Sequence, residues 1–214
     1  MEPDLSDEEL LAAFQQGDAG AFERLLRRHR SPLFTFLVRM LGDRERAEDL
    51  AQEAFLRIVK GAGAWERRAR FKAWLYAIAR NLCADAGRRD KFRRTDSLDT
   101  RAPGRDGEEG APLVEELAGD GPGPDRGAES ARLRPVLTRA LAALPEEQRE
   151  VFVLREQAGV TFTEIAEMLG VNENTVKSRM RYALLGLRKA LSAAGIGDDA
   201  QAAPPPQPGK AGRA

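Results

Sequence analysis

The segment TFTEIAEMLGVNENTVKSRMRYALLGL, residues 161–187, carries the clearest structural pattern in this chain of 214 residues. Ala166, Gly170 and Val176 lie where a helix-turn-helix needs a small residue facing the partner helix, a turn residue that tolerates positive φ, and an apolar residue that locks the second helix. Asn172 is a suitable N-cap for that second helix. Three matching constraints at this spacing predict a helix-turn-helix.

The second helix of this unit has two chemically different faces. Val176, Met180, Leu184 and Leu187 recur at helical spacing and predict one buried stripe. A helix in the major groove presents its opposite face to base edges, where Asn can pair with adenine and Arg or Lys with guanine. The alternative, a solvated face on an ordinary helical hairpin, is disfavoured by the turn spacing. Asn174, Lys177, Ser178 and Arg181 make up this opposite face. Arg179, Arg188 and Lys189 lie toward its flanks and suit phosphates. The residues predicted to bind the duplex, called here the duplex-reading residues, are Asn174, Thr175, Lys177, Ser178, Arg179 and Arg181.

The rest of the chain also carries sequence signals for the starts and ends of helices. No segment alternates apolar and polar residues with a period of two over the length of a strand, and β-branched residues are sparse. We therefore expect an all-α fold. The predicted signals are a capping box at Ser6 and Glu9, a stop and cap at Gly17-Asp18, a helix start at Ser31-Pro32, a stop and cap at Gly42-Asp43, helix starts near Phe71 and Pro145, and a stop at Gly87.

Charge and composition divide the chain into four parts. Residues 1–94 form a first helical block, and residues 132–193 form a second block that holds the helix-turn-helix. Between them, residues 95–131 are rich in Gly, Pro and acids and predict a flexible acidic linker, while the Pro-rich residues 194–214 predict a disordered tail. Residues 21–94 carry 19 basic and 9 acidic side chains, and residues 95–131 carry 3 and 10.

Several classes of function are excluded by composition. One Cys and one His cannot supply an internal disulfide or a protein zinc site, so we expect no metal and no other cofactor. No nucleophile elbow or phosphate loop is present, which argues against an enzyme. The longest apolar runs are too short to span a membrane and the acidic start is unlike a signal peptide, so we expect a cytoplasmic protein without membrane insertion.

The first block has an acidic face that includes a leucine. Residues 47, 50, 51, 54 and 58 form the expected core stripe of one helix, which leaves Asp49, Gln52, Glu53 and Leu56 together on the other side. A leucine among acids on an exposed face indicates a protein partner. From the pattern alone, a solvated polar face with one stray leucine is the better interpretation.

The next helix interleaves basic and aromatic side chains. Phe71, Trp74, Leu75, Ile78 and Leu82 form its expected core stripe. Cations beside an aromatic ring attract phosphates and offer a flat surface to unstacked bases, as a single strand requires. Trp65 could serve the core or stack on a base. The candidate strand-binding residues are Lys72, Tyr76, Arg80, Arg88 and Arg89, preceded by the basic connection that contains Trp65, Glu66, Arg67, Arg68 and Arg70.

Together these segments resemble a known family. DLAQEAF at 49–55, FKAWLYAIARN at 71–81, and LPEEQR at 144–149 followed by residues 161–188 are similar to bacterial RNA polymerase sigma factors of the small extracytoplasmic-function (ECF) group. The resemblance covers roughly residues 6–94 and 132–191. It implies a factor that binds core RNA polymerase, directs it to promoter DNA and assists promoter melting, regulated by an anti-sigma factor.

The resemblance also implies residue roles. Asp49, Gln52, Glu53 and Phe55, with Leu56 beside them, match the motif that docks on the clamp helices of the polymerase largest subunit. The connection 65–70 matches the loop that captures a flipped minus-ten base, the basic-aromatic residues match the surface along the melting strand, and the duplex-reading residues match the minus-thirty-five helix. The loop is more Arg-rich than the family pattern, which leaves its base preference open.

A conventional helix-turn-helix regulator with a sensing or dimerising first domain remains the alternative. It would explain the second block equally well, but not the basic first block or the acidic face with its leucine. Co-purification with core polymerase would separate the two functions.

Overall fold

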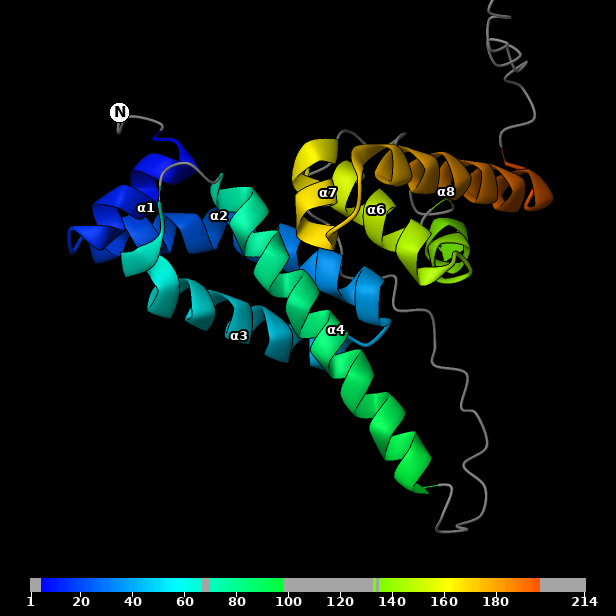
Figure 1. The fold of residues 1–214 in the computed structure, drawn as a ribbon, viewed down its shortest axis with the longest axis horizontal. Helices are drawn as coiled ribbons and strands as arrows, with labels where there is room; N and C mark the ends of the chain where they lie inside the picture. The colour runs from blue at the N-terminus through cyan, green and yellow to red at the C-terminus, as the bar shows by residue number, and fades with distance from the viewer. Residues whose placement is uncertain (1–4, 67–69, 98–132, 134, 197–214) are drawn as a thin grey trace, which may run out of the picture.

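The computed structural model describes residues 5–66, 70–97, 133 and 135–196. Every regular element within these residues is a helix, as Figure 1 shows, which confirms the prediction of an all-α fold. Residues 98–131 of the predicted linker and 197–214 of the predicted tail lie outside the described part. Within the part of the chain that the structure describes, none of the helices could span a membrane.

The first block is a bundle of four α-helices with one short 3-10 turn. Two predicted N-caps are confirmed, because Asp18 and Asp43 each accept a backbone N–H with a side-chain oxygen, and Gly42 ends its helix in the left-handed conformation. The predicted capping box at Ser6 and Glu9 is also confirmed. The elements are α1 (Asp7–Gln15), α2 (Ala19–Leu41), α3 (Arg44–Gly61), η1 (Ala62–Ala64) and α4 (Phe71–Ser97).

Two predicted helix boundaries in this block are wrong. Ser31-Pro32 does not begin a helix, since α2 continues through Pro32. Gly87 does not end α4, which runs on to Ser97. In α2 the buried side chains on both sides of the proline lie on one stripe, namely Leu25, His29, Leu33, Phe36 and Leu37.

The second block contains α6 (Glu146–Glu156), α7 (Phe162–Leu169) and α8 (Glu173–Ala193), preceded by a helical stretch at residues 135–142. Pro145 is the N-cap residue of α6, with Glu146 and Glu147 in its first turn, where the helix dipole favours acids. Ala140 and Leu141 of the helical stretch pack in one buried cluster with Ala183 and Leu187 of α8. Leu144, just after the stretch, belongs to the same cluster, and a Cβ added to Gly186 would meet its Cδ2 at 2.7 Å. A glycine at 186 therefore permits this close approach.

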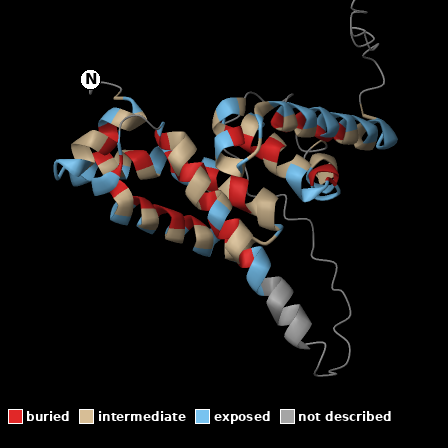
Figure 2. Ribbon diagram, in the orientation of Figure 1, coloured by how far each residue is buried: buried red, intermediate tan, exposed pale blue. Residues whose placement is uncertain are grey.

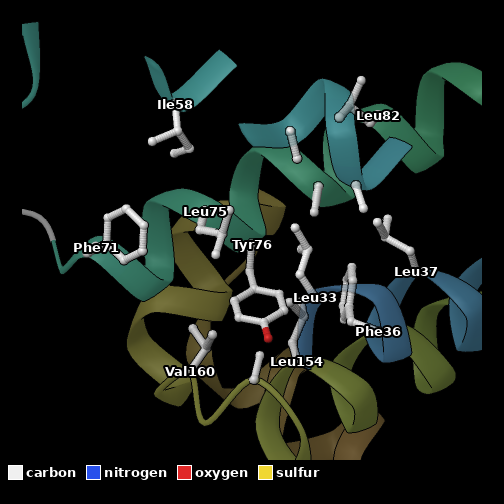
Figure 3. Close-up of a cluster of buried hydrophobic side chains, with 14 of the residues drawn as sticks. Leu33, Phe36, Leu37, Ile58, Phe71, Leu75, Tyr76, Leu82, Leu154 and Val160 are labelled. Atoms are coloured by element: carbon white, nitrogen blue, oxygen red, sulfur yellow. The ribbon is translucent and has the colours of Figure 1, made fainter. Parts of the chain in front are cut away.

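One hydrophobic core runs through both blocks. The packing order is α1 and α3 on α2, α4 on α3, and then α6 against α2 and α7 against α4. The buried positions in Figure 2 accordingly continue from the first block into α6 and α7. In Figure 3 the Tyr76 ring of α4 lies among Leu33 and Phe36 of α2 and Leu154 and Val160 of the second block. The two blocks therefore pack against each other through one interface. Part of the surface of α4 that was predicted to bind a DNA strand lies inside this interface.

Candidate polymerase-binding and nucleic-acid interfaces

The acidic face of α3 is accessible. Asp49 and Gln52 are exposed, and Leu56 is 52% exposed. Glu53 is half-buried and accepts a hydrogen bond from Arg57 Nε at 2.8 Å, which holds the pKa of that carboxyl below its usual value. Sequence reasoning missed Val59, which is 42% exposed one turn from Leu56. Because it follows Leu56 by three residues, a search for apolar neighbours on that face could have found it.

Phe55 needs a correction as a docking residue. Its ring is only 7% exposed and belongs to the core, so α3 does not present it to a partner. The physical reason is helical geometry, since Phe55 adjoins the buried Ala54 and lies near Ala51 and Ile58 on the stripe that faces α2 and α4. Phe55 holds α3 in place behind the exposed face.

The connection before α4 is held at both ends by α1. Gln15 Nε2 donates to the carbonyl oxygens of Ala62 at 2.7 Å and Trp65 at 3.1 Å, and Glu8 Oε1 accepts the backbone N–H of Phe71 at 2.9 Å. Sequence reasoning missed both positioning residues, because each acts across more than 45 positions. Helix α1 therefore fixes where the connection leaves η1 and where it enters α4.

Within this connection the described residues have different environments. Trp65 is 8% exposed, so its ring is in the core, although its indole Nε1 has no hydrogen-bond partner. Of the two roles left open for Trp65, the structure favours the core. Glu66 and Arg70 are exposed. Arg67 and Arg68 lie outside the described residues.

Tyr76 also departs from the prediction. It was expected on an exposed strand-binding stripe, but it is 1% exposed, and its ring meets Phe36 edge-on at a centroid distance of 5.1 Å. Burial raises the pKa of the Tyr76 hydroxyl to about 12. The reason is that α4 is covered on two sides, by the rest of the first block and by the second block (Figure 3).

The cations of the same stripe face the second block. Arg80 Nε donates to Glu150 Oε1 of α6 at 2.8 Å, with both side chains largely buried. Lys72 Nζ lies beside the turn before α7, at 3.8 Å from where a Cβ on Gly159 would stand. Farther along α4, Arg88 and Arg89 are exposed, and Arg88 pairs with Asp85. The structure therefore splits the predicted strand-binding residues into a covered set and an open set.

The helix-turn-helix has the predicted geometry. Gly170 ends α7 at φ +65°, Asn172 accepts the Thr175 backbone N–H at 2.7 Å to begin α8, and Ala166 and Val176 are buried between the two helices. A second capping box, Thr161 with Glu164, begins α7. These caps fix the angle at which α8 leaves the turn.

The duplex-reading face of α8 is open to solvent at four positions, Asn174, Lys177, Ser178 and Arg181. The hydroxyl of Thr175 donates to the Asn172 side chain at 3.0 Å, so it supports the cap. Arg179 pairs with Glu147 of α6 at 2.7 Å and is only 20% exposed. Lys177 pairs with Glu173 at 2.6 Å and remains more than half exposed.

Leu184 needs a correction. It is 49% exposed and does not join the buried stripe, which runs through Val176, Met180, Ala183 and Leu187. Offsets of 0, 4, 7 and 11 residues keep these four side chains within a narrow arc, whereas offset 8 turns Leu184 away. With Tyr182 and Leu185, it is one of three large apolar side chains exposed on α8.

Both helical blocks match families of known proteins. Residues 25–93 match the family model for Sigma-70 region 2, and residues 135–185 match that for Sigma-70 region 4. The chain is similar to the ECF RNA polymerase sigma factor SigW of Bacillus subtilis, at 32% identity over 83% of this chain and 92% of SigW. It is also similar to the ECF sigma factor SigM of Mycobacterium tuberculosis, at 36% identity over 87% of this chain and 85% of SigM.

Solved structures match the fold. The sigma factor RpoE from Bartonella quintana, crystallised with the anti-sigma factor NepR, superposes with a TM-score of 0.60 at 22% identity, over 80% of this chain and 96% of that chain. CnrH in complex with the cytosolic domain of CnrY gives a TM-score of 0.59 at 22% identity, over 87% of this chain and 97% of that chain. Taken with the two family models and the curated relatives, the chain belongs to the ECF group of RNA polymerase sigma factors, the initiation factors that bind core RNA polymerase and direct it to promoters.

Proposed function

We propose that three separate surfaces of this chain carry the steps of promoter recognition. The acidic face of α3 docks on core polymerase, the basic face of α4 with the preceding connection receives the melted minus-ten strand, and the exposed face of α8 reads the minus-thirty-five duplex. The observation that carries this proposal is the open face of α8, with Asn174, Lys177, Ser178 and Arg181 exposed on a helix whose other side is buried.

The docking surface is Asp49, Gln52, Glu53 and Leu56 on α3. An exposed leucine bordered by carboxylates combines an apolar contact with charge, which suits a basic, partly apolar partner surface. The motif of the family assigns that partner to the clamp helices of the polymerase largest subunit. Phe55 supports this surface from the core side.

The proposed strand-binding surface is Lys72, Arg80, Arg88 and Arg89, with the connection 65–70, while Tyr76, also predicted there from the sequence, is buried and supports this face of α4 from the core. Unstacking a base costs a few kcal/mol, which nearby positive charge and a pocket must offset. The excess of basic residues between positions 21 and 94 supplies the charge. Trp65 backs the connection from the core while Glu66, Arg67, Arg68 and Arg70 are the residues of the base-capturing loop.

Regulation and location follow from the same family. An anti-sigma factor is the proposed partner in regulation, as NepR is for the sigma factor RpoE of Bartonella quintana. Because its proposed partners are core polymerase and promoter DNA, we place the protein in the cytoplasm. It contributes binding energy and no catalytic group of its own.

Co-purification tests this function against a conventional helix-turn-helix regulator. Purified core polymerase is mixed with the full chain without DNA and passed through a sizing column. A sigma factor elutes with core polymerase and then gives the complex the ability to start transcripts at defined sites. A protein that binds duplex DNA but never co-elutes with core polymerase is a conventional regulator, and the proposal is then wrong.

A further inference from the structure

Helix α1 holds both ends of the proposed base-capturing connection, residues 65–70. Gln15 Nε2 donates to the carbonyl oxygen of Trp65, the first residue of the connection, at 3.1 Å. Glu8 Oε1 accepts the backbone N–H of Phe71, the residue that follows the connection, at 2.9 Å. These contacts reach 50 and 63 positions along the chain, so they tie the connection to a helix that is distant in sequence.

Glu8 and Gln15 occupy one edge of α1. Their separation in sequence is close to two helical turns, so their side chains leave the helix in nearly the same direction and about 10 Å apart along its axis. Leu11 lies between them, one turn from each, and is completely buried. The rise of α1 therefore fixes the separation of the two points at which the connection is anchored.

Helix α1 is in turn fixed to α2. Leu10 and Leu11 are completely buried in the core. Asp7 Oδ2 lies 2.7 Å from His29 Nε2, and Asp7 Oδ1 accepts a hydrogen bond from Arg28 Nη1 at 3.2 Å. The hydrogen bond with the buried His29 ring is the main reason why the pKa of the Asp7 carboxyl lies below its usual value. Because α1 cannot slide on α2 without breaking these contacts, it holds the connection rigidly.

A segment that binds a flipped base loses conformational freedom, and anchoring its ends beforehand lowers that cost. We propose that α1 is the positioning element of the connection, and that Gln15 and Glu8 hold its two ends in the arrangement that accepts the flipped base. This inference rests on the proposed function of the connection 65–70. Both residues act through the backbone of Trp65 and Phe71, so they are positioning residues and not part of the base-binding surface.

Four substitutions on α1 and at its end test this role. Gln15→Met keeps the length of the side chain but removes the N–H donors, and Gln16→Met is its matched control at the exposed neighbouring position. Glu8→Met removes the acceptor for the Phe71 N–H. Glu8→Gln is the conservative variant, because its amide oxygen can still accept that hydrogen bond.

Base selection by the holoenzyme is the main measurement. Each variant is assembled with core polymerase and selects from a library of single strands of random sequence, about 12 nucleotides long, and a strand enriched by the wild type is then used to measure affinity. Gln15→Met and Glu8→Met should bind this strand about tenfold more weakly and lose base preference, because an unanchored connection must be ordered on binding. Gln16→Met and Glu8→Gln should match the wild type. Equal affinities and preferences in all four variants would overturn the inference.

Two further measurements separate positioning from a general loss of stability. Hydrogen exchange of the Phe71 amide, followed by NMR in the full chain without DNA, should speed up in Glu8→Met and stay as in the wild type in Glu8→Gln. Affinity of the holoenzyme for a random-sequence duplex should be the same in all four variants. Unchanged exchange in Glu8→Met, or a loss of duplex affinity parallel to the loss for the single strand, would contradict the positioning role.

A variant within the connection distinguishes this inference from the proposed function on which it rests. Arg67→Ala with Arg68→Ala should change the base preference if the connection captures a base. If this double variant changes the preference and Gln15→Met does not, the connection binds the base without help from α1, and the positioning role is wrong. If neither changes it, the proposed function of the connection fails and the positioning role fails with it.

Discussion

Tyr76 joins the two blocks through its ring, which contacts α2, α6 and the turn after α6 (Figure 3). No pattern in the sequence distinguishes it from an exposed aromatic, since the cations Lys72 and Arg80 lie four residues away on either side. Its burial depends on residues more than 70 positions later in the chain. A non-local contact of this kind cannot be read from the periodicity of one helix.

Tyr76→Ala should lower the free energy of unfolding by about 3 to 5 kcal/mol, because it removes a ring from a packed core. Tyr76→Phe keeps the ring and should cost much less. Urea unfolding followed by circular dichroism measures both. If Tyr76→Ala cost no more than Tyr76→Phe, the ring would not be part of the core in solution.

Arg181 and Arg188 are both exposed on α8 but have different predicted roles. Arg181→Ala should weaken binding to the preferred duplex by about 1 to 3 kcal/mol and change the preferred bases, because it removes a base contact. Arg188→Ala should weaken all duplexes alike. Selection from a randomised duplex library by the holoenzyme measures both effects. Unchanged base preference in Arg181→Ala would remove Arg181 from the reading set.

The side-chain caps that begin helices are the features of these elements that the sequence predicts best. Side-chain caps at Ser6, Asp18, Asp43 and Asn172 act on backbone groups three residues away, so local sequence determines them. The wrong boundary at Pro32 has the opposite cause. A proline inside a helix costs about 3 kcal/mol, and the continuous buried stripe of α2 on both sides of Pro32 offsets this cost.

The faces of a helix were less predictable than its ends. A spacing of four residues predicts Leu184 in the core stripe, but Ala183 fills the position that faces the core. Phe55 shows the reverse error, since a resemblance at the level of sequence does not say whether a side chain of the motif contacts the partner or supports the helix. Burial decides between these roles.

Reversing charge on the exposed face of α3 tests that element alone. Asp49→Lys should abolish binding to core polymerase with little change in stability, because Asp49 lies off the buried stripe. Glu23→Lys is the control. Glu23 is an exposed acidic residue on α2, so this substitution makes the same change of charge at a site away from the α3 face. Binding is measured by titrating labelled protein with core polymerase. Equal affinities for the two variants would reject this face as the docking surface.

At the scale of the whole molecule, the all-α class and the helix-turn-helix were predictable, while the contact between the blocks was not. Cys83 lies near this contact, where Glu150 and Glu146 of α6 add to burial in raising the pKa of its thiol to about 12. Tyr76 has a pKa of about 12 for the same reason of burial. Both groups are neutral when protonated, so the folded state disfavours their ionisation.

Alkaline pH should therefore destabilise the folded molecule. Since both pKa values are raised above the ordinary values of 9.0 and 10.0, their contribution is complete below about pH 9 and is lost as pH rises toward about 12. Urea unfolding between pH 8 and pH 10.5 should show a steeper loss for wild type than for Cys83→Ala. Identical slopes would mean that the Cys83 thiol is not buried in solution.

Promoter selection is the defining activity of a sigma factor. The most direct measurement is to map transcript 5′ ends made in vitro from fragmented genomic DNA by core polymerase, with and without this protein. With it, defined starts should appear that share two upstream elements about two helical turns apart, and Arg181→Ala should redistribute them. Starts identical to those of core polymerase alone would contradict the assignment.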